Sequence, residues 1–217
     1  MQSVPTIVYK DENVVVIIKP IGMPSQSDPT GDIDAMTATS ELLLSLGERD
    51  SLWLVHRLDR NVSGLLAFAR NKKSAAELSK IIQNGIFSKK YIAVCHGEAD
   101  EGEYRDFLYK DSATSKAYVV KTERKGAKEA RLDLVRLGVC DEKSLVHVTL
   151  DTGRFHQIRA QLSSRGLPIY GDGKYGSREK APHFALWASK LSFAYKGKKY
   201  EFKKEPDFDT IPWNMFS

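Results

Sequence analysis

The densest group of chemically versatile side chains lies in the segment His56-Arg57-Leu58-Asp59-Arg60. An imidazole and two guanidinium groups surround one carboxylate, and nearby positive charge favours the ionised form of an aspartate. An ionised carboxylate here could act as a nucleophile, a general base or a metal ligand. Apolar runs flank the segment, so we expect a functional loop held between two strands. A surface turn with salt bridges at its rim is the alternative interpretation.

A second polar cluster occupies residues 152–159, with the sequence TGRFHQIR. Apolar residues recur there at helical spacing, with Gly166 as the expected exit, so the cluster falls at the start of a predicted helix. Helix starts leave backbone N–H groups unpaired and attract anions, and arginine pairs well with carboxylates and phosphates. Asp59 is one candidate partner, and a polar helix face turned to water is the alternative. The polar side chains are Arg154, His156, Gln157 and Arg159.

Other motifs carry weaker signals. The five histidines show neither an i, i+4 pair around a glutamate nor cysteines at ligand spacing, so we expect no metal ion. The segment 171–176, GDGKYG, lacks the full phosphate-loop pattern and is typical of a tight turn. Six lysines between Lys190 and Lys204 lie near aromatic residues, which suits RNA contacts; a solvated hairpin is the alternative.

Turn signals and apolar periodicity predict the elements that position the first cluster. Residues 7–20 form a predicted hairpin, and a polar loop over 21–34 leads to a helix over 39–46. Asn71 can cap a second helix that Gly85 would end. The first cluster should therefore lie on a loop that precedes this second helix.

The middle and the end of the chain read mostly as strands. Residues 89–150 contain β-rich runs at short intervals, which favours an antiparallel meander. A further hairpin is expected to turn at Lys196-Gly197, and the ordered part to close at Pro206. The predicted class is α+β, dominated by sheet.

Length and composition bound the class of protein. The chain has 217 residues, and 33 Lys and Arg against 28 Asp and Glu leave a net charge of +5. We expect one compact domain over 1–217 with a real core, because 41% of the residues are hydrophobic. No apolar run approaches the roughly 20 residues of a membrane span, and no secretory signal is evident, so we expect a cytoplasmic protein. Cys95 and Cys140 are expected to be buried, reduced thiols.

Together the motifs resemble those of the RluA-type family of RNA pseudouridine synthases. The stretch HRLDRNVSGLLAFAR (56–70) is similar to the family's His-Arg-Leu-Asp segment, and KKYIAVCHG (89–97) to its Lys-x-Tyr strand. The stretch TGRFHQIRAQLSSRGLPIYGDGKYG (152–176) is similar to the family's Thr-Gly-Arg-x-His-Gln-Ile-Arg block. The closing LWASKLSF (186–193) also matches, so the likeness covers roughly residues 5–205.

The resemblance implies an isomerase that converts uridines of ribosomal or transfer RNA to pseudouridine without a cofactor or a metal. It implies that Asp59 is the catalytic carboxylate, that Tyr91 stacks on or supports the target base, and that Arg154 pairs with Asp59. Whether Asp59 attacks C1′, adds to the uracil ring or removes a ribose proton stays open. Arg57 would help to extrude the uridine from its stack. The expected RNA-binding residues are Arg57, Arg60, His156, Gln157 and Arg159.

The resemblance further implies a mixed, mainly antiparallel sheet with flanking helices and a central active-site cleft. Many family members carry an N-terminal RNA-binding S4 domain, which is not expected here because only a few residues precede the first predicted strand. RNA recognition is then expected from the catalytic domain itself, with RNA as the partner and neither a membrane nor an obligate protein partner. The polar loop 21–34 and the basic segment 111–130 are the expected specificity elements.

Two other classes stay open. A non-catalytic RNA-binding protein or RNA folding chaperone could use the same fold, although the presence of Asp59, Tyr91 and Arg154 together weighs against it. A metal-dependent hydrolase using Asp59 is disfavoured, because Arg57 and Arg60 already supply the positive charge that a metal would bring.

Overall fold

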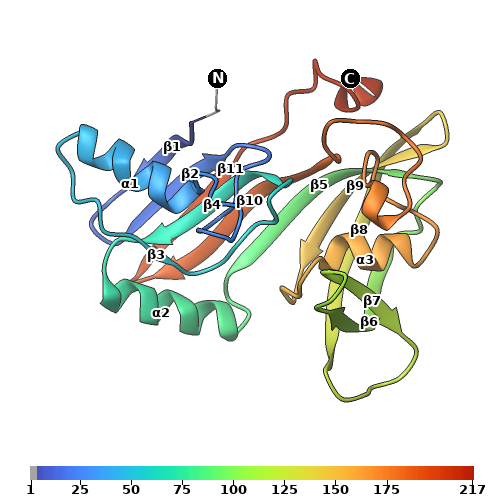
Figure 1. The fold of residues 1–217 in the computed structure, drawn as a ribbon, viewed down its shortest axis with the longest axis horizontal. Helices are drawn as coiled ribbons and strands as arrows, with labels where there is room; N and C mark the ends of the chain where they lie inside the picture. Colours follow the sequence, from blue (N-terminus) through green and yellow to red (C-terminus); the bar gives the residue numbers. More distant parts are fainter. Residues whose placement is uncertain (1–3) are drawn as a thin grey trace. The chain divides into compact units, whose positions relative to one another are not determined.

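The computed structural model describes residues 4–217, which divide into two compact units. The first unit holds the described residues up to Ser88 together with Ala188–Glu205, and the second holds Lys89–Trp187 and Pro206–Ser217. Helices and strands alternate irregularly along the described chain, and the strands are mostly antiparallel (Figure 1). This confirms the predicted α+β class.

The first unit is built on a layer in the order β1-β2-β4-β10, with β3 paired to β4 and β11 paired to β10. The two residues that open β10 belong to the second unit. The strands are β1 (Thr6–Lys10), β2 (Val14–Lys19), β3 (Trp53–Leu54), β4 (Ser63–Ala69), β10 (Leu186–Tyr195) and β11 (Lys198–Lys203), and the helices are α1 (Ala35–Ser45) and α2 (Lys72–Gln83). The hairpins predicted over 7–20 and at Lys196-Gly197 are confirmed.

Strands β2 and β4 form the centre of the first core because almost every residue in them is apolar and buried. Alternate residues of a strand face opposite sides of a sheet, so burial of both sets means that both faces of these strands are covered. Helix α2 packs Leu78 against one face, and Figure 1 shows it running along β3 and β4. The two strands pair antiparallel, and Lys19 at the end of β2 lies opposite Gly64.

Gly64 has a clear steric reason to be glycine. Its backbone φ is +112°, and a Cβ there would lie 2.4 Å from the carbonyl oxygen of Ala188 on β10. Any side chain would therefore force β4 and β10 apart. The start of β4, directly after the Asp59 loop, is thus fixed between two neighbouring strands.

The helix predictions hold with one shift in position. Asn71 caps α2, accepting a hydrogen bond from the backbone N–H of Ser74 at 2.8 Å, and Gly85 has the left-handed φ of +72°. Helix α1 begins at Ala35 rather than at residue 39, because the Asp34 side chain accepts hydrogen bonds from the N–H groups of Met36 and Thr37. An aspartate cap of this kind fixes the first turn of a helix.

The second unit is an antiparallel layer in the order β5-β9-β8-β6-β7. It is not the simple meander that was predicted, because β5 pairs with β9 and β8 pairs with β6 rather than with β7. Its elements are β5 (Ser88–His96), β6 (Gly102–Asp111), β7 (Lys116–Val120), β8 (Ala127–Cys140), β9 (Lys143–Leu150), α3 (Gln157–Ser163) and the short 3₁₀ helices η1 (Gly173–Tyr175) and η2 (Trp213–Phe216).

Helix α3 covers one face of this layer, with Ala160 packed among Leu108, Ala117 and Ala130. The helix has seven residues and follows His156, whose φ is +51°. Across the described residues, no helix has the length and apolar character that a membrane crossing requires.

The expectation that order ends at Pro206 is wrong. The chain continues into η2, where Trp213 is buried and Phe216 lies 3.7 Å from the place of a Cβ on Gly138 of β8. The two cysteines are both free, as predicted, but only Cys95 is fully buried. The apolar residues that follow Pro206 thus pack against the second unit.

Candidate active site

Asp59 lies in the first unit, on the loop that joins β3 to β4. Its neighbours Leu58 and Val62 are 4% and 2% exposed, so they anchor the loop in the interior while Asp59 itself is half-buried. The N–H of Val62 donates to the carbonyl oxygen of Asp59 at 3.0 Å and closes a turn around it. Asp59 therefore lies on a hydrogen-bonded turn between two strands, and the loop predicted for residues 56–60 is confirmed.

Ser25 ties this turn to the loop that follows β2. Its hydroxyl donates to the carbonyl oxygen of Leu58 at 2.8 Å and accepts from the Leu58 N–H at 3.0 Å. Ser25 is buried, so these bonds satisfy polar groups that would otherwise lie unpaired in the interior. The position of Leu58, one residue before Asp59, is thereby fixed.

Lys19 also supports the turn, a role that the local sequence pattern did not predict. Its side chain is fully buried, and the ammonium donates to the carbonyl oxygens of Pro20 at 2.8 Å, Met23 at 2.7 Å and Arg60 at 3.0 Å. Burial lowers the pKa of Lys19 to about 7, although the negative charge of Asp59 acts to raise that pKa. A lysine closing an aliphatic strand just before a proline was the available signal.

His56 fixes the entrance of the loop. Its Nε2 accepts a hydrogen bond from the backbone N–H of Ala67 on β4 at 3.1 Å, so the imidazole fills a gap in the strand pairing. The ring also packs on Phe87, with 5.2 Å between the centroids. His56 thus has a positioning role, which the sequence did not assign to it.

The two arginines beside Asp59 have different surroundings. Arg57 is exposed. Arg60 donates to the hydroxyl of Thr30 at 2.7 Å and forms an ion pair with Asp32. The predicted RNA contact of Arg60 is untested, but the structure gives it a second role as the clamp of the 28–32 segment.

The other predicted site residues lie in the second unit. Tyr91 is on β5, opposite Val148 of β9, and its side chain is 6% exposed. Lys89, two residues earlier on the same strand, is half-buried, and burial lowers its pKa. The pairing of Arg154 with Asp59 joins residues of the two units, and it stays a prediction.

Gln157 organises the turn that carries Arg154. Its side-chain oxygen accepts hydrogen bonds from the Thr152 hydroxyl at 2.7 Å and the Arg154 N–H at 2.9 Å. Its amide group donates to the carbonyl oxygen of Arg131 at 3.0 Å. Gln157 is 3% exposed, which fits an interior support better than the predicted RNA contact. Arg154 is exposed, and its Nε donates to the carbonyl oxygen of Glu129 at 2.8 Å.

Arg159 is also an interior residue. It is 6% exposed, and its guanidinium donates to both carboxylate oxygens of Asp172, at 2.7 and 2.9 Å. The ring of Phe184 lies 4.4 Å from the guanidinium carbon. The predicted RNA contact of Arg159 does not fit this geometry. His156, in contrast, is half-buried, stacks on Phe155 at 3.8 Å and lies 3.0 Å from the Tyr175 hydroxyl.

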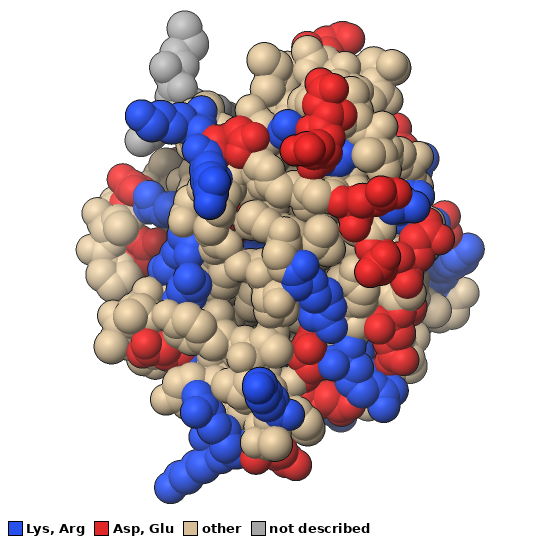
Figure 2. Space-filling model, turned by 90° about the vertical axis from the view of Figure 1, so that its right-hand side faces the viewer, with Lys and Arg blue, Asp and Glu red and all other residues tan. Residues whose placement is uncertain are grey.

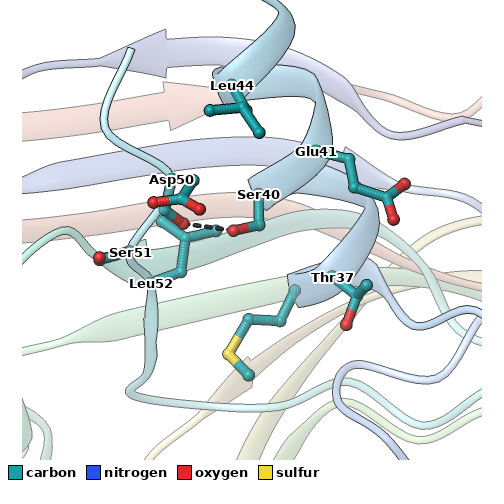
Figure 3. Close-up of a pocket in the computed structure, with 8 residues that line it drawn as sticks. Thr37, Ser40, Glu41, Leu44, Asp50, Ser51 and Leu52 are labelled. Atoms are coloured by element: carbon teal, nitrogen blue, oxygen red, sulfur yellow. Dashed lines mark hydrogen bonds between the residues drawn. The ribbon is translucent and has the colours of Figure 1, made fainter.

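A pocket of about 300 Å³ lies elsewhere in the first unit, between α1 and residues 50–52. Figure 3 shows Ser40 donating a hydrogen bond to the backbone of Asp50 at its wall. None of the predicted site residues lines it. We therefore do not connect this pocket with the candidate chemistry.

The fold is that of RNA pseudouridylate synthases, as two solved structures show. Human RNA pseudouridylate synthase domain containing 1 superposes with a TM-score of 0.79 at 22% identity, covering 96% of this chain and 86% of that one. Human RNA pseudouridylate synthase domain containing 4 gives the same TM-score at 23% identity, covering 97% and 90%.

Sequence comparison leads to the same family. The model of the RNA pseudouridylate synthase family matches residues 13–164, and the chain belongs to this family. An uncharacterised RNA pseudouridine synthase of Zymomonas mobilis is 33% identical, covering 89% of each chain. The ribosomal large subunit pseudouridine synthase C of Rickettsia bellii is 29% identical over 82% of this chain. The matched region covers only 58% of the length of that relative.

Replacing Lys19 by methionine will change how stability depends on pH. The folded protein holds the Lys19 pKa near 7, whereas the unfolded chain restores the ordinary value of 10.5. The unfolded state therefore binds more protons between these pH values, and the stability of the wild type rises with pH there. Urea unfolding at pH 7, 8 and 9 should show the wild type gaining up to about 1.4 kcal/mol per pH unit over the variant. Parallel profiles would contradict this, and the exposed Lys72→Met is the control.

Removing one partner of the Arg159–Asp172 pair will destabilise the protein. Asp172→Asn leaves a buried guanidinium without its counter-charge, which costs about 3–5 kcal/mol of unfolding free energy. The double variant Arg159→Met, Asp172→Leu removes both charges and should lose much less. Urea unfolding measures both. If Asp172→Asn is as stable as the wild type but binds RNA more weakly, the interior role of Arg159 is contradicted and the predicted RNA contact is favoured.

Proposed function

We propose that the protein isomerises specific uridines of ribosomal or transfer RNA to pseudouridine, with Asp59 as the catalytic carboxylate. The observation that carries this proposal is the turn at Asp59, which lies within the part of the chain that matches the family. Hydrogen bonds made by the buried Lys19 and Ser25 and by the half-buried His56 hold that turn. A surface turn with rim salt bridges would not need such interior support.

The reaction balances without a co-reactant. The N1–C1′ bond of uridine breaks, the uracil turns, and C5 bonds to C1′ while the C5 hydrogen leaves as a proton and N1 gains one. Attack by Asp59 on C1′, addition to the uracil ring and removal of a ribose proton all begin from its carboxylate form. Hydrogen bonds to the backbone of Leu58 and Arg60 hold the loop on both sides of Asp59, which lowers the entropic cost of positioning its carboxylate for any of these steps.

Tyr91 and Arg154 are the proposed partners of Asp59. We assign Tyr91 to the target base, since its aromatic ring is held on β5, which pairs along its length with β9. We assign Arg154 to the Asp59 carboxylate, because its backbone is set by Gln157 and an arginine pairs with a carboxylate through two parallel hydrogen bonds. Arg57, exposed beside Asp59, is the proposed residue that helps to extrude the uridine.

The name of the Rickettsia relative favours ribosomal RNA as the substrate. Transfer RNA stays the alternative substrate, and a non-catalytic RNA-binding protein stays the alternative function. The cytoplasmic location expected from the sequence stays a prediction.

Asp59→Asn should abolish isomerisation and keep RNA binding. The amide occupies the same space but cannot act as a nucleophile or a base, so the rate should fall at least about 100-fold. Tritium release from RNA labelled at C5 of uridine measures the reaction on bulk ribosomal and transfer RNA. The exposed Asp209→Asn is the control and should react like the wild type. Binding without release by any of these proteins would favour the non-catalytic alternative.

Arg154→Ala should lower turnover more than RNA affinity. If Arg154 orients Asp59, its loss weakens an interaction made with the reacting group rather than with the RNA backbone. Arg154→Lys keeps the charge without the two-pronged geometry, so it should restore affinity but only part of the turnover. Single-turnover kinetics and filter binding separate the two effects. Equal losses in both would assign Arg154 to a phosphate instead.

A further inference from the structure

One stretch of the second unit is strongly basic. Residues 107–128 contain six Lys and Arg and two acidic residues, which gives them a local net charge of +4. Among residues 4–217, none of these six cations forms an ion pair with a carboxylate. The cations are Lys110, Lys116, Lys121, Arg124, Lys125 and Lys128.

The lysines of the β10–β11 hairpin in the first unit behave differently. Lys190 and Lys199 both pair with Glu201, and together they lower the pKa of that carboxyl to about 2. Lys203 pairs with Glu205. Four of the six lysines between Lys190 and Lys204 thus have a carboxylate partner, with Lys198 paired to Asp11, which fits the solvated hairpin that the sequence left as the alternative.

Aromatic rings accompany the unpaired cations of the second unit. Tyr109 on β6 lies directly opposite Tyr118 on β7, so the two rings share one face of the sheet. The guanidinium of Arg124 lies 4.4 Å from the centroid of the Tyr109 ring, and the Lys116 ammonium lies 5.4 Å from that of Tyr118. Tyr118 is 41% exposed, so part of its ring is open to a ligand.

This face is separate from the core of the unit. The intervening residues Leu108 and Ala117 point to the other face, where they pack against α3. Figure 2 shows Lys and Arg side chains projecting at the lower end of the molecule, where Figure 1 places the turn from β7 to β8. We call the exposed side of residues 107–128 the hairpin face.

We infer that the hairpin face binds unpaired RNA, with a base stacked on Tyr118 and phosphates along Lys121, Arg124 and Lys125. This deepens the proposed function and rests on it, because it names the kind of RNA that the enzyme docks. Stacking on an aromatic ring requires a base whose face is open, and a duplex hides these faces. The cations supply contacts to the backbone that tolerate any sequence.

The first test compares two triple variants that remove the same charge. The first variant changes the hairpin face and combines Lys121→Gln, Arg124→Gln and Lys125→Gln. The second variant changes the β10–β11 hairpin and combines Lys190→Gln, Lys199→Gln and Lys203→Gln. Fluorescence anisotropy with a labelled single-stranded oligouridylate gives affinity against salt concentration. Loss of three contacts should reduce the slope of log K against log salt by about 2 for the first variant. The second should retain the wild-type slope, and equal reduction in both would overturn the inference.

The second test addresses stacking. Tyr118→Ala should weaken single-strand binding by about 5- to 100-fold, whereas Tyr118→Phe should bind like the wild type because the ring is kept. A duplex RNA of matched length should bind more weakly than the single strand and should not respond to Tyr118→Ala. Equal losses in Tyr118→Ala and Tyr118→Phe, or equal binding of the duplex, would overturn the assignment to unpaired RNA.

The failure of this inference differs from the failure of the proposed function. Asp59→Asn should bind the oligouridylate as tightly as the wild type. If the wild type releases no tritium but the hairpin face variants still lose single-strand binding, the proposed function fails and the RNA surface stands. If the wild type isomerises RNA and the variants bind normally, only the hairpin face is rejected.

Discussion

The buried ammonium of Lys19 is the interaction on which the candidate site depends. Burying a charged group without partners is too costly to tolerate, so the three carbonyl oxygens that accept its hydrogen bonds must stay in place. Two of these belong to the loop after β2, and the third belongs to Arg60, the residue after Asp59. One side chain therefore joins the loop after β2 to the Asp59 loop, where its acceptor Arg60 is 41 residues away in the sequence.

The strand layer supplies the other half of this constraint. Lys19 lies opposite Gly64, and Gly64 has no room for a side chain because the Ala188 backbone is so close. The exit of the Asp59 loop is thus fixed by packing, while its entrance is fixed by the hydrogen bond of His56 to β4. The second unit follows the same principle, with Gln157 and the Arg159–Asp172 pair holding the turn and helix that follow β9. Buried polar groups with satisfied hydrogen bonds specify both turns.

Much of the arrangement can be predicted from the sequence, because it depends on local signals. The Asn71 cap, the two hairpins and the Asp59 loop each have turn residues and apolar neighbours that define them. The supports of the loop cannot be predicted in this way. Lys19 looks like the polar end of a strand until its three long-range acceptors are known. Arg159 and Gln157 look like surface residues for the same reason, since burial depends on how α3 packs.

Strand order was the other failure of prediction. Residues 89–150 indicate antiparallel strands, yet β5 pairs with β9 because pairing across long loops is decided by the whole core. The tail after Pro206 was expected to lie outside the ordered part, but Trp213 finds a buried site in the second unit. Both corrections concern contacts between residues that are distant in the chain, which local patterns do not encode.

Hydrogen exchange at the amides of Leu58 and Val62 tests the role of Lys19 most directly, because both amides make hydrogen bonds within the Asp59 loop or to its support. In Lys19→Met, exchange at these two amides should accelerate strongly, while the paired amides of Leu65–Phe68 on β4 keep most of their protection. Unchanged exchange at Leu58 and Val62, or an equal loss of protection throughout β4, would contradict the claim that Lys19 holds the Asp59 turn.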